Sequence, residues 1–261
     1  MGETDGVRAT TEDETTLRAA IARLYAVFER YPSDHRGPAC PHCVGEPERA
    51  RLHATPLAAL SWDDFGRYPT KAVTTWGDAD AFRHFLPRLL ELVACGEALP
   101  ARPGRFSDDE APFDVELTLG KLDFAGLAAW PLREREAVEA FMRARLRFLL
   151  GEPPGRPTPG NWVLQAACSG VALTPLLDEW AADSRAQAAL HLAAWVHERL
   201  PQLASGGLRS AFLESGGTAL RCVTAWVRAQ GEWLMAATER CPAPALDVWT
   251  AAEALVDLAG D

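Results

Sequence analysis

The stretch that decides the fold reads DADAFRHFLPRLLELVACG, from Asp78 to Gly96. Its apolar residues recur at steps of three and four, the spacing that places side chains on one face of a helix. The residues of this face are Phe82, Leu86, Leu89 and Val93. Asp78 suits the N-cap position, and Gly96 suits the position after the last turn. The stretch therefore predicts an amphipathic helix with a buried face.

Similar helical patterns, separated by Gly and Pro breaks, fill most of the chain. We expect helices near 17–31, 47–54, 61–75, 131–150, 161–171, 174–183, 184–200, 217–240 and 244–259. Thr11 and Glu14 form a candidate capping box for the first of them, and Ser61 with Asp64 form one for the third. The only strand-like alternation covers 115–119, and one such run cannot make a sheet.

These patterns predict an all-α fold with little or no sheet. We expect an irregular array of helix pairs of the HEAT or tetratricopeptide kind, or an α-bundle, although the chain has no repeat of fixed period. We expect one helical domain over 1–261, with a candidate subdomain boundary in the acidic, Pro-rich connection 100–118.

Composition narrows the function classes. The 261 residues are 48 % hydrophobic and 24 % charged, and no stretch is apolar enough to predict a membrane span. The N-terminus is polar and acidic, unlike a secretory signal, so we expect a cytoplasmic protein that does not bind membranes. The net charge of −10, from 36 acidic and 26 basic residues, disfavours nucleic acid as a partner.

The loop after the first helix contains the sequence Cys40-Pro41-His42-Cys43. Two thiolates at this spacing can bind one tetrahedral zinc ion, because the two residues between them form the turn. The sequence predicts zinc ligation by Cys40, Cys43 and His84, with His35 or His53 as the fourth ligand. Reduced thiols without a metal, and redox chemistry, remain open alternatives.

His84 belongs to a polar stripe on the predicted helix 78–96. Asp80, His84, Arg88 and Glu91 follow at steps of four, four and three, so they share one face. An acid one turn before a histidine can fix the tautomer of a metal-bound or catalytic imidazole. The same stripe would equally suit a solvated helix face with ion pairs.

Two resemblances follow from these motifs. Cys40-Pro41-His42-Cys43 resembles the active-site tetrapeptide of thiol oxidoreductases of the thioredoxin superfamily, but here a helix and a Pro/Gly loop precede it, where that fold has a strand. The Cys-x-x-Cys loop, Thr74–Asp78 and Phe82–Arg88 together resemble a group of uncharacterised bacterial helical proteins with a Trp-Gly-Asp and a His-Phe-Leu-Pro-Arg stretch. This resemblance covers residues 40–95 most clearly and implies no activity.

The chain contains no phosphate-binding loop, nucleophile elbow or dinucleotide fingerprint, so its motifs favour no established enzyme class. Six of its nine tryptophans follow residue 160, and we expect most of them in the core. The first functional hypothesis is a helical adaptor or immunity-type scaffold that binds a protein partner, for example a basic one. The alternative is a metal- or thiol-dependent enzyme or sensor that uses the Cys40, Cys43 and His84 region.

Overall fold

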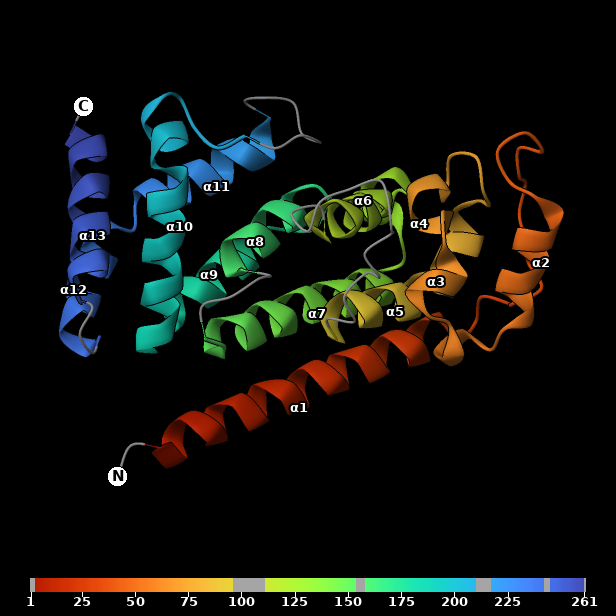
Figure 1. Ribbon diagram of the computed structural model, residues 1–261, viewed down its shortest axis with the longest axis horizontal. Coiled ribbons are helices and arrows are strands. Elements are labelled where there is room, and N and C mark those ends of the chain that lie inside the picture. Colours follow the sequence, from red (N-terminus) through yellow and green to blue (C-terminus); the bar gives the residue numbers. More distant parts are fainter. Residues whose placement is uncertain (1–2, 96–110, 154–157, 210–216, 242–244, 261) are drawn as a thin grey trace. The chain divides into compact units, whose positions relative to one another are not determined.

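The computed structural model describes residues 3–95, 111–153, 158–209, 217–241 and 245–260 (Figure 1). Thirteen α-helices occur in these ranges, with no strand, only isolated β-bridges. The all-α prediction is therefore confirmed. The strand-like run 115–119 lies inside helix α6, and most of the predicted boundary at 100–118 lies outside the described residues.

The chain forms two compact units, which we describe separately. The Cys-loop unit contains residues 18–141 and 169–171, and the C-terminal unit contains residues 1–17, 142–168 and 172–261. Two long helices, α1 (Glu3–Phe28) and α7 (Leu132–Gly151), contribute residues to both units.

The Cys-loop unit holds the decisive stretch as α5 (Ala79–Cys95), with Pro87 inside the helix. Its apolar face is buried, as predicted; the residues are Phe82, Leu86, Leu89 and Val93. The other elements are α2 (Glu46–Ala54), η1 (Leu57–Ala59), α3 (Trp62–Phe65), α4 (Tyr68–Lys71), α6 (Ala111–Phe124) and η3 (Leu127–Ala129).

Aromatic rings form the centre of this unit. The ring of Phe85 lies 5.7 Å from that of Phe65 and 5.0 Å from that of Tyr68, in edge-on geometry. Trp76 extends the cluster, with its ring 5.3 Å from that of Tyr68. Such edge-on pairs stabilise a core beyond the area they bury. The cluster therefore joins α3, α4 and α5 to the segment before Asp78.

The C-terminal unit contains α8 (Pro159–Ala167), α9 (Thr174–Ala182), α10 (Ala186–Ala204), α11 (Thr218–Arg228), α12 (Gly231–Ala237), η4 (Thr238–Arg240) and α13 (Ala245–Gly260). Trp162, Trp180 and Trp195 are buried, whereas Trp226 and Trp233 are partly exposed and Trp249 is exposed, so three of the six tryptophans after residue 160 lie in the core. The rings of Trp180 and Trp195 stack at 6.0 Å. Gly160 allows α8 to approach the Trp195 ring, because a Cβ there would lie 2.3 Å from it. Helix α13 packs against α10 and α12.

Three predicted helices differ from those observed. The first begins at Glu3, so the Thr11–Glu14 capping box is wrong and these residues lie within α1. The predicted helix 61–75 divides into α3 and α4, because Gly66 adopts a positive φ of 50° between them. The predicted helix 217–240 divides into α11, α12 and η4.

Candidate functional site

The segment 29–45, here called the Cys loop, is held against the residues that precede α5. The Cys40 amide donates to the Thr75 carbonyl at 2.9 Å, and the Gly77 amide donates to the Pro38 carbonyl at 2.7 Å. Ala39 and Trp76 form an antiparallel bridge between these bonds. Since Trp76 is itself buried, the bridge fixes the middle of the loop to the core of the unit.

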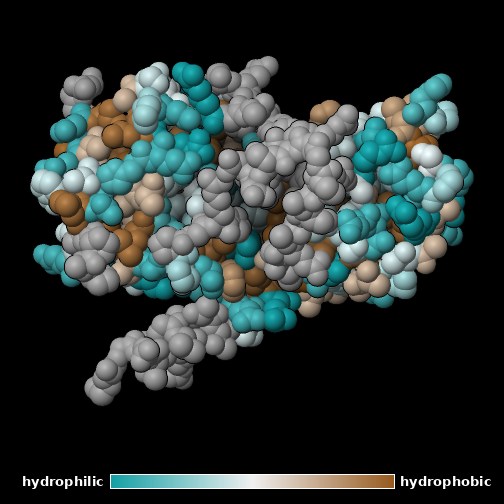
Figure 2. All heavy atoms as spheres, in the orientation of Figure 1, coloured by the Kyte–Doolittle hydropathy of each residue, from teal (hydrophilic) through white to brown (hydrophobic). Residues whose placement is uncertain are grey.

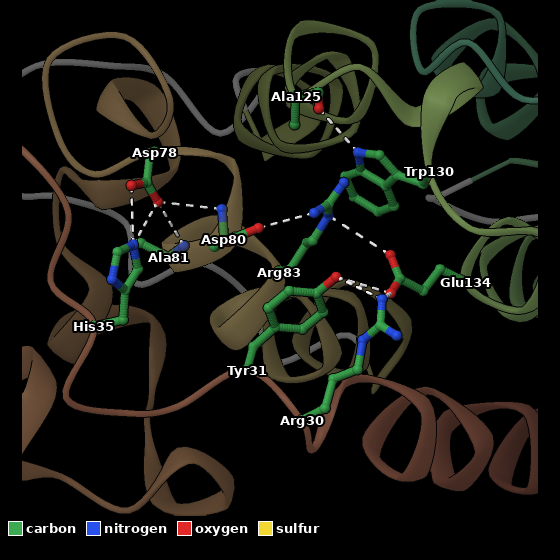
Figure 3. Close-up of polar contacts among 10 residues, drawn as sticks. All are labelled: Arg30, Tyr31, His35, Asp78, Asp80, Ala81, Arg83, Ala125, Trp130 and Glu134. Carbon is green, nitrogen blue, oxygen red and sulfur yellow. Dashed lines mark hydrogen bonds and ion pairs between the residues drawn. The ribbon is translucent and has the colours of Figure 1, made fainter.

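His35 and Asp78 provide a second anchor (Figure 3). The His35 Nε2 atom lies 2.9 and 3.0 Å from the two carboxylate oxygens of Asp78. Asp78 also accepts from the amides of Asp80 and Ala81, which confirms it as the N-cap of α5. Although burial opposes ionisation, the Ala81 amide and His35 hold the pKa of Asp78 below its ordinary value. The carboxylate thus ties the Cys loop to the start of α5.

Gly37 makes this close approach possible. Its φ is +60°, and a Cβ at this position would lie 2.8 Å from the Asp78 amide nitrogen. A larger residue would therefore both strain the backbone and collide with the start of α5.

Cys40 and Cys43 are free thiols, both partly exposed, at the two ends of one turn. The Cys43 amide donates to the Cys40 carbonyl at 3.0 Å and closes the turn. The backbone amide of His42 and the Cys43 thiol hydrogen bond to the Cys40 sulfur and lower the pKa of Cys40 to about 7. A thiol with such a pKa is substantially ionised near neutral pH, and the thiolate is both the nucleophile and the metal ligand.

The predicted histidine ligands lie in hydrogen bonds of their own. His84 Nδ1 lies 3.0 Å from the Tyr31 carbonyl, and His53 Nδ1 lies 2.8 Å from the Ser33 carbonyl. Burial lowers the pKa of both imidazoles, so each is neutral near pH 7 and donates to its carbonyl through Nδ1. His35 Nε2 hydrogen bonds to the Asp78 carboxylate at 2.9 Å.

The structure therefore brings Cys40 and Cys43 together, while His35, His53 and His84 have other partners. Among the described residues, no group of three or more His, Cys, Asp or Glu side chains is placed to hold a metal ion. Zinc ligation by Cys40, Cys43 and His84 stays a prediction. The hydrogen bonds described above anchor the Gly- and Pro-containing Cys loop without a metal ion.

His84 also lines an open hollow of about 490 Å³ in the Cys-loop unit. Helix α1 forms one wall through Tyr25, and Pro87 of α5 contributes to another. Because His84 Nδ1 donates to a carbonyl, its Nε2 atom is the unprotonated nitrogen and acts as an acceptor. The Tyr25 hydroxyl donates to Glu91 at 2.5 Å, and burial raises the pKa of this phenol. The hollow is thus lined by the His84 imidazole, by Glu29 and two tyrosines, and by apolar side chains.

A buried carboxylate gathers charged side chains near the end of α1 (Figure 3). Glu134, with 1 % of its side chain exposed, accepts from the Tyr31 hydroxyl at 2.8 Å and pairs with Arg30. Arg83 lies 3.6 Å from the same carboxylate through Nε, and its guanidinium covers the ring of Trp130 at 4.6 Å. We call these five residues the Glu134 cluster. Sequence reasoning missed it, because its members are far apart in the chain and form no motif.

The C-terminal unit exposes large apolar side chains along one face of α13. Leu246, Trp249 and Val256 are 68 %, 41 % and 49 % exposed. They share this face with Glu253 and Asp257, both exposed, because the positions follow at helical spacing. We call these five residues the α13 stripe. Figure 2 shows hydrophobic and hydrophilic side chains intermixed over this edge of the unit, where α12 and α13 lie.

Comparison with known proteins yields no relative: no protein-family model, curated protein or solved structure matches the chain. Within the described residues, no helix is both long and apolar enough to cross a bilayer.

Proposed function

We propose that this chain is a protein-interaction module that binds a basic amphipathic helix along the α13 stripe. The observation that carries the proposal is the exposure of Leu246, Trp249 and Val256 on one helical face. Large apolar side chains that cluster on a surface mark interaction sites, whereas isolated ones need no explanation. Tryptophan in particular is enriched among residues that dominate binding energy.

The charge of the stripe selects the kind of partner. Its two ionisable residues, Glu253 and Asp257, are both acidic, and Asp247 adds a third carboxylate to the same helix. Helix α13 carries no Lys, Arg or His. Complementary charge speeds association and excludes wrong partners, so the stripe fits a helix that combines apolar anchors with Lys or Arg.

The same charges argue against a second copy of this chain as the partner. A two-fold symmetric dimer would bring the same patch of each chain together. Glu253 and Asp257 of both chains would then lie in one desolvated surface that contains no basic residue of either stripe, and like charges repel strongly there. A basic partner forms ion pairs with these carboxylates instead.

The test uses the full chain and two synthetic peptides that have the same leucine face, one with lysine and one with glutamate on the polar face. Isothermal titration calorimetry should detect binding of the leucine–lysine peptide and not of the leucine–glutamate peptide. Trp249→Ser, and separately the charge reversal Glu253→Lys with Asp257→Lys, should each weaken binding at least about tenfold, or about 1.4 kcal/mol.

Matched control variants separate the stripe from the general negative charge of the chain. Leu132→Ser removes an exposed apolar residue from the Cys-loop unit, and Glu12→Lys with Asp34→Lys reverses two exposed charges elsewhere. Both controls should bind the lysine peptide as the wild type does. Equal loss in the control and stripe variants would show attraction by net charge alone and refute the proposal.

A further inference from the structure

We propose that Cys40 and Cys43 form a redox-active dithiol that is converted to an intramolecular disulfide by exchange with a small-molecule disulfide such as glutathione disulfide. This site is independent of the α13 stripe, which belongs to the other unit. Its geometry rests on three features of the Cys loop.

The first feature is the spacing of the two residues. The hydrogen bond from the Cys43 amide to the Cys40 carbonyl, 3.0 Å long, closes a four-residue turn. The end Cα atoms of such a turn lie within about 7 Å. Disulfides need a Cα separation of about 4.4 to 6.8 Å. The two sulfurs can therefore join with little movement of the backbone.

The second feature is the rigidity of the surrounding loop. The amide of Cys40 is bonded to Thr75, and the segment before it is bridged to the buried Trp76. The Val44 amide bonds to the same Cys40 carbonyl at 3.0 Å, which fixes the other end of the turn. A turn held from both sides has already lost the conformational freedom that closing a disulfide ring would otherwise cost.

The third feature is the accessibility of the two sulfurs. We assign Cys40, whose pKa is lowered to about 7 by the neighbouring His42 and Cys43 groups, as the attacking sulfur and Cys43 as the resolving one. Both side chains are partly exposed, so a small disulfide can reach them.

The exchange balances in two steps. The Cys40 thiolate attacks one sulfur of the small disulfide RSSR, forms Cys40–S–SR and releases RS⁻, which takes a proton from water. Cys43 then loses its proton to the solvent and attacks the Cys40 sulfur, which expels the second RS⁻. The protein dithiol loses two electrons and two protons, and RSSR is reduced to two RSH.

Trypsin makes the site measurable in the intact chain, because cleavage after Arg36 and Arg49 releases a peptide that contains Cys40, Cys43 and no other cysteine. The full-length protein is equilibrated with mixtures of reduced and oxidised glutathione, quenched in acid and alkylated before digestion. In mass spectrometry, the 37–49 peptide should convert from a doubly alkylated form to one that lacks two hydrogens and carries no label.

Two variants and one internal control identify the roles. Cys43→Ser should stop at a mixed disulfide with one glutathione on Cys40, whereas Cys40→Ser should slow the reaction with glutathione disulfide at least about tenfold, because it removes the thiol whose pKa is lowered. Cys222, which is partly exposed but is not part of a Cys-x-x-Cys turn, should at most form a mixed disulfide.

Three outcomes would overturn the proposal in the wild-type protein, where folding is not in question. The peptide could stay doubly alkylated at every glutathione ratio, or it could carry two glutathiones without an internal bond. Thiols that react only after a chelator is added would show that the sulfurs hold a metal ion instead.

Discussion

Replacing Glu134 by Ala should strongly destabilise the Cys-loop unit. The substitution removes a buried carboxylate that pairs with Arg30 and Arg83 and accepts from the Tyr31 hydroxyl. Removing one partner of a buried ion pair costs about 3 to 5 kcal/mol. The cost here should be about 2 to 4 kcal/mol, because Arg83 keeps an ion pair with Asp80 at 2.8 Å and still covers the Trp130 ring.

Urea unfolding followed by far-UV circular dichroism measures this cost. With a slope of about 2 kcal/mol per molar, the midpoint should fall by about 1 to 2 M. Glu134→Gln keeps the side-chain volume and an acceptor for Tyr31, so it should cost less, about 1 to 2 kcal/mol. A double-mutant cycle with Arg83→Met should give a coupling energy of about 0.5 to 3 kcal/mol.

Glu136→Ala is the matched control. Glu136 lies on the same helix and pairs with Arg23 at 3.4 Å, but about half of each side chain is exposed. An exposed pair of this kind contributes about 0 to 1 kcal/mol, so the control should unfold close to the wild type. If Glu134→Ala lowered the free energy of unfolding no more than Glu136→Ala does, the Glu134 cluster would not stabilise the unit.

Three further predictions concern the cores of the two units. Gly160→Ala should destabilise the C-terminal unit by about 1 to 3 kcal/mol, because the new methyl collides with the Trp195 ring. Thermal unfolding measures this loss, and an unchanged midpoint would contradict the prediction. Tyr68→Phe should leave the free energy of unfolding unchanged or raise it by up to about 1 kcal/mol, since the buried hydroxyl has no hydrogen-bond partner among the described residues. Urea unfolding measures this change, and a clear loss of stability would contradict the prediction. Burial lowers the pKa of His191, although its bond to the Glu152 carbonyl opposes the shift. The neutral ring therefore stabilises the fold above the unfolded pKa of about 6.5, and this contribution is lost as the pH falls below that value. Urea midpoints should fall less between neutral and mildly acidic pH in His191→Gln than in the wild type, and parallel profiles would exclude His191 as the source.

The sequence predicted the local features well, because their causes lie within a few residues. Asp78 as the N-cap of α5 and the capping box of Ser61 and Asp64 are both observed. The prediction failed where distant packing decided the boundary. Gly231, for instance, begins α12 inside the predicted helix 217–240, at a point where Val256 of α13 lies against it.

The candidate site was less predictable. Cys40 and Cys43 were found because both residues lie in one short motif. The partners of the histidines are mostly backbone carbonyls, as for His84 and Tyr31, and a carbonyl acceptor leaves no trace in the residue types. The Glu134 cluster depends on three segments that meet only after the chain folds, and its arginines look like ordinary surface charges in the sequence.

The bonds between residues 38–40 and 75–77 have a consequence for how this region can change. They hold together the two ends of the chain segment that contains α2, α3 and α4. This segment is therefore a long loop that is closed at its base. Lengthening a closed loop costs only about 0.6 kcal/mol for each doubling. The closed loop should therefore tolerate insertions in its outer turns if Phe65 and Tyr68 still pack on Phe85. Because the bonds at its base stay in place, new segments can be grafted into these outer turns, beside the Cys loop, without rebuilding the rest of the unit.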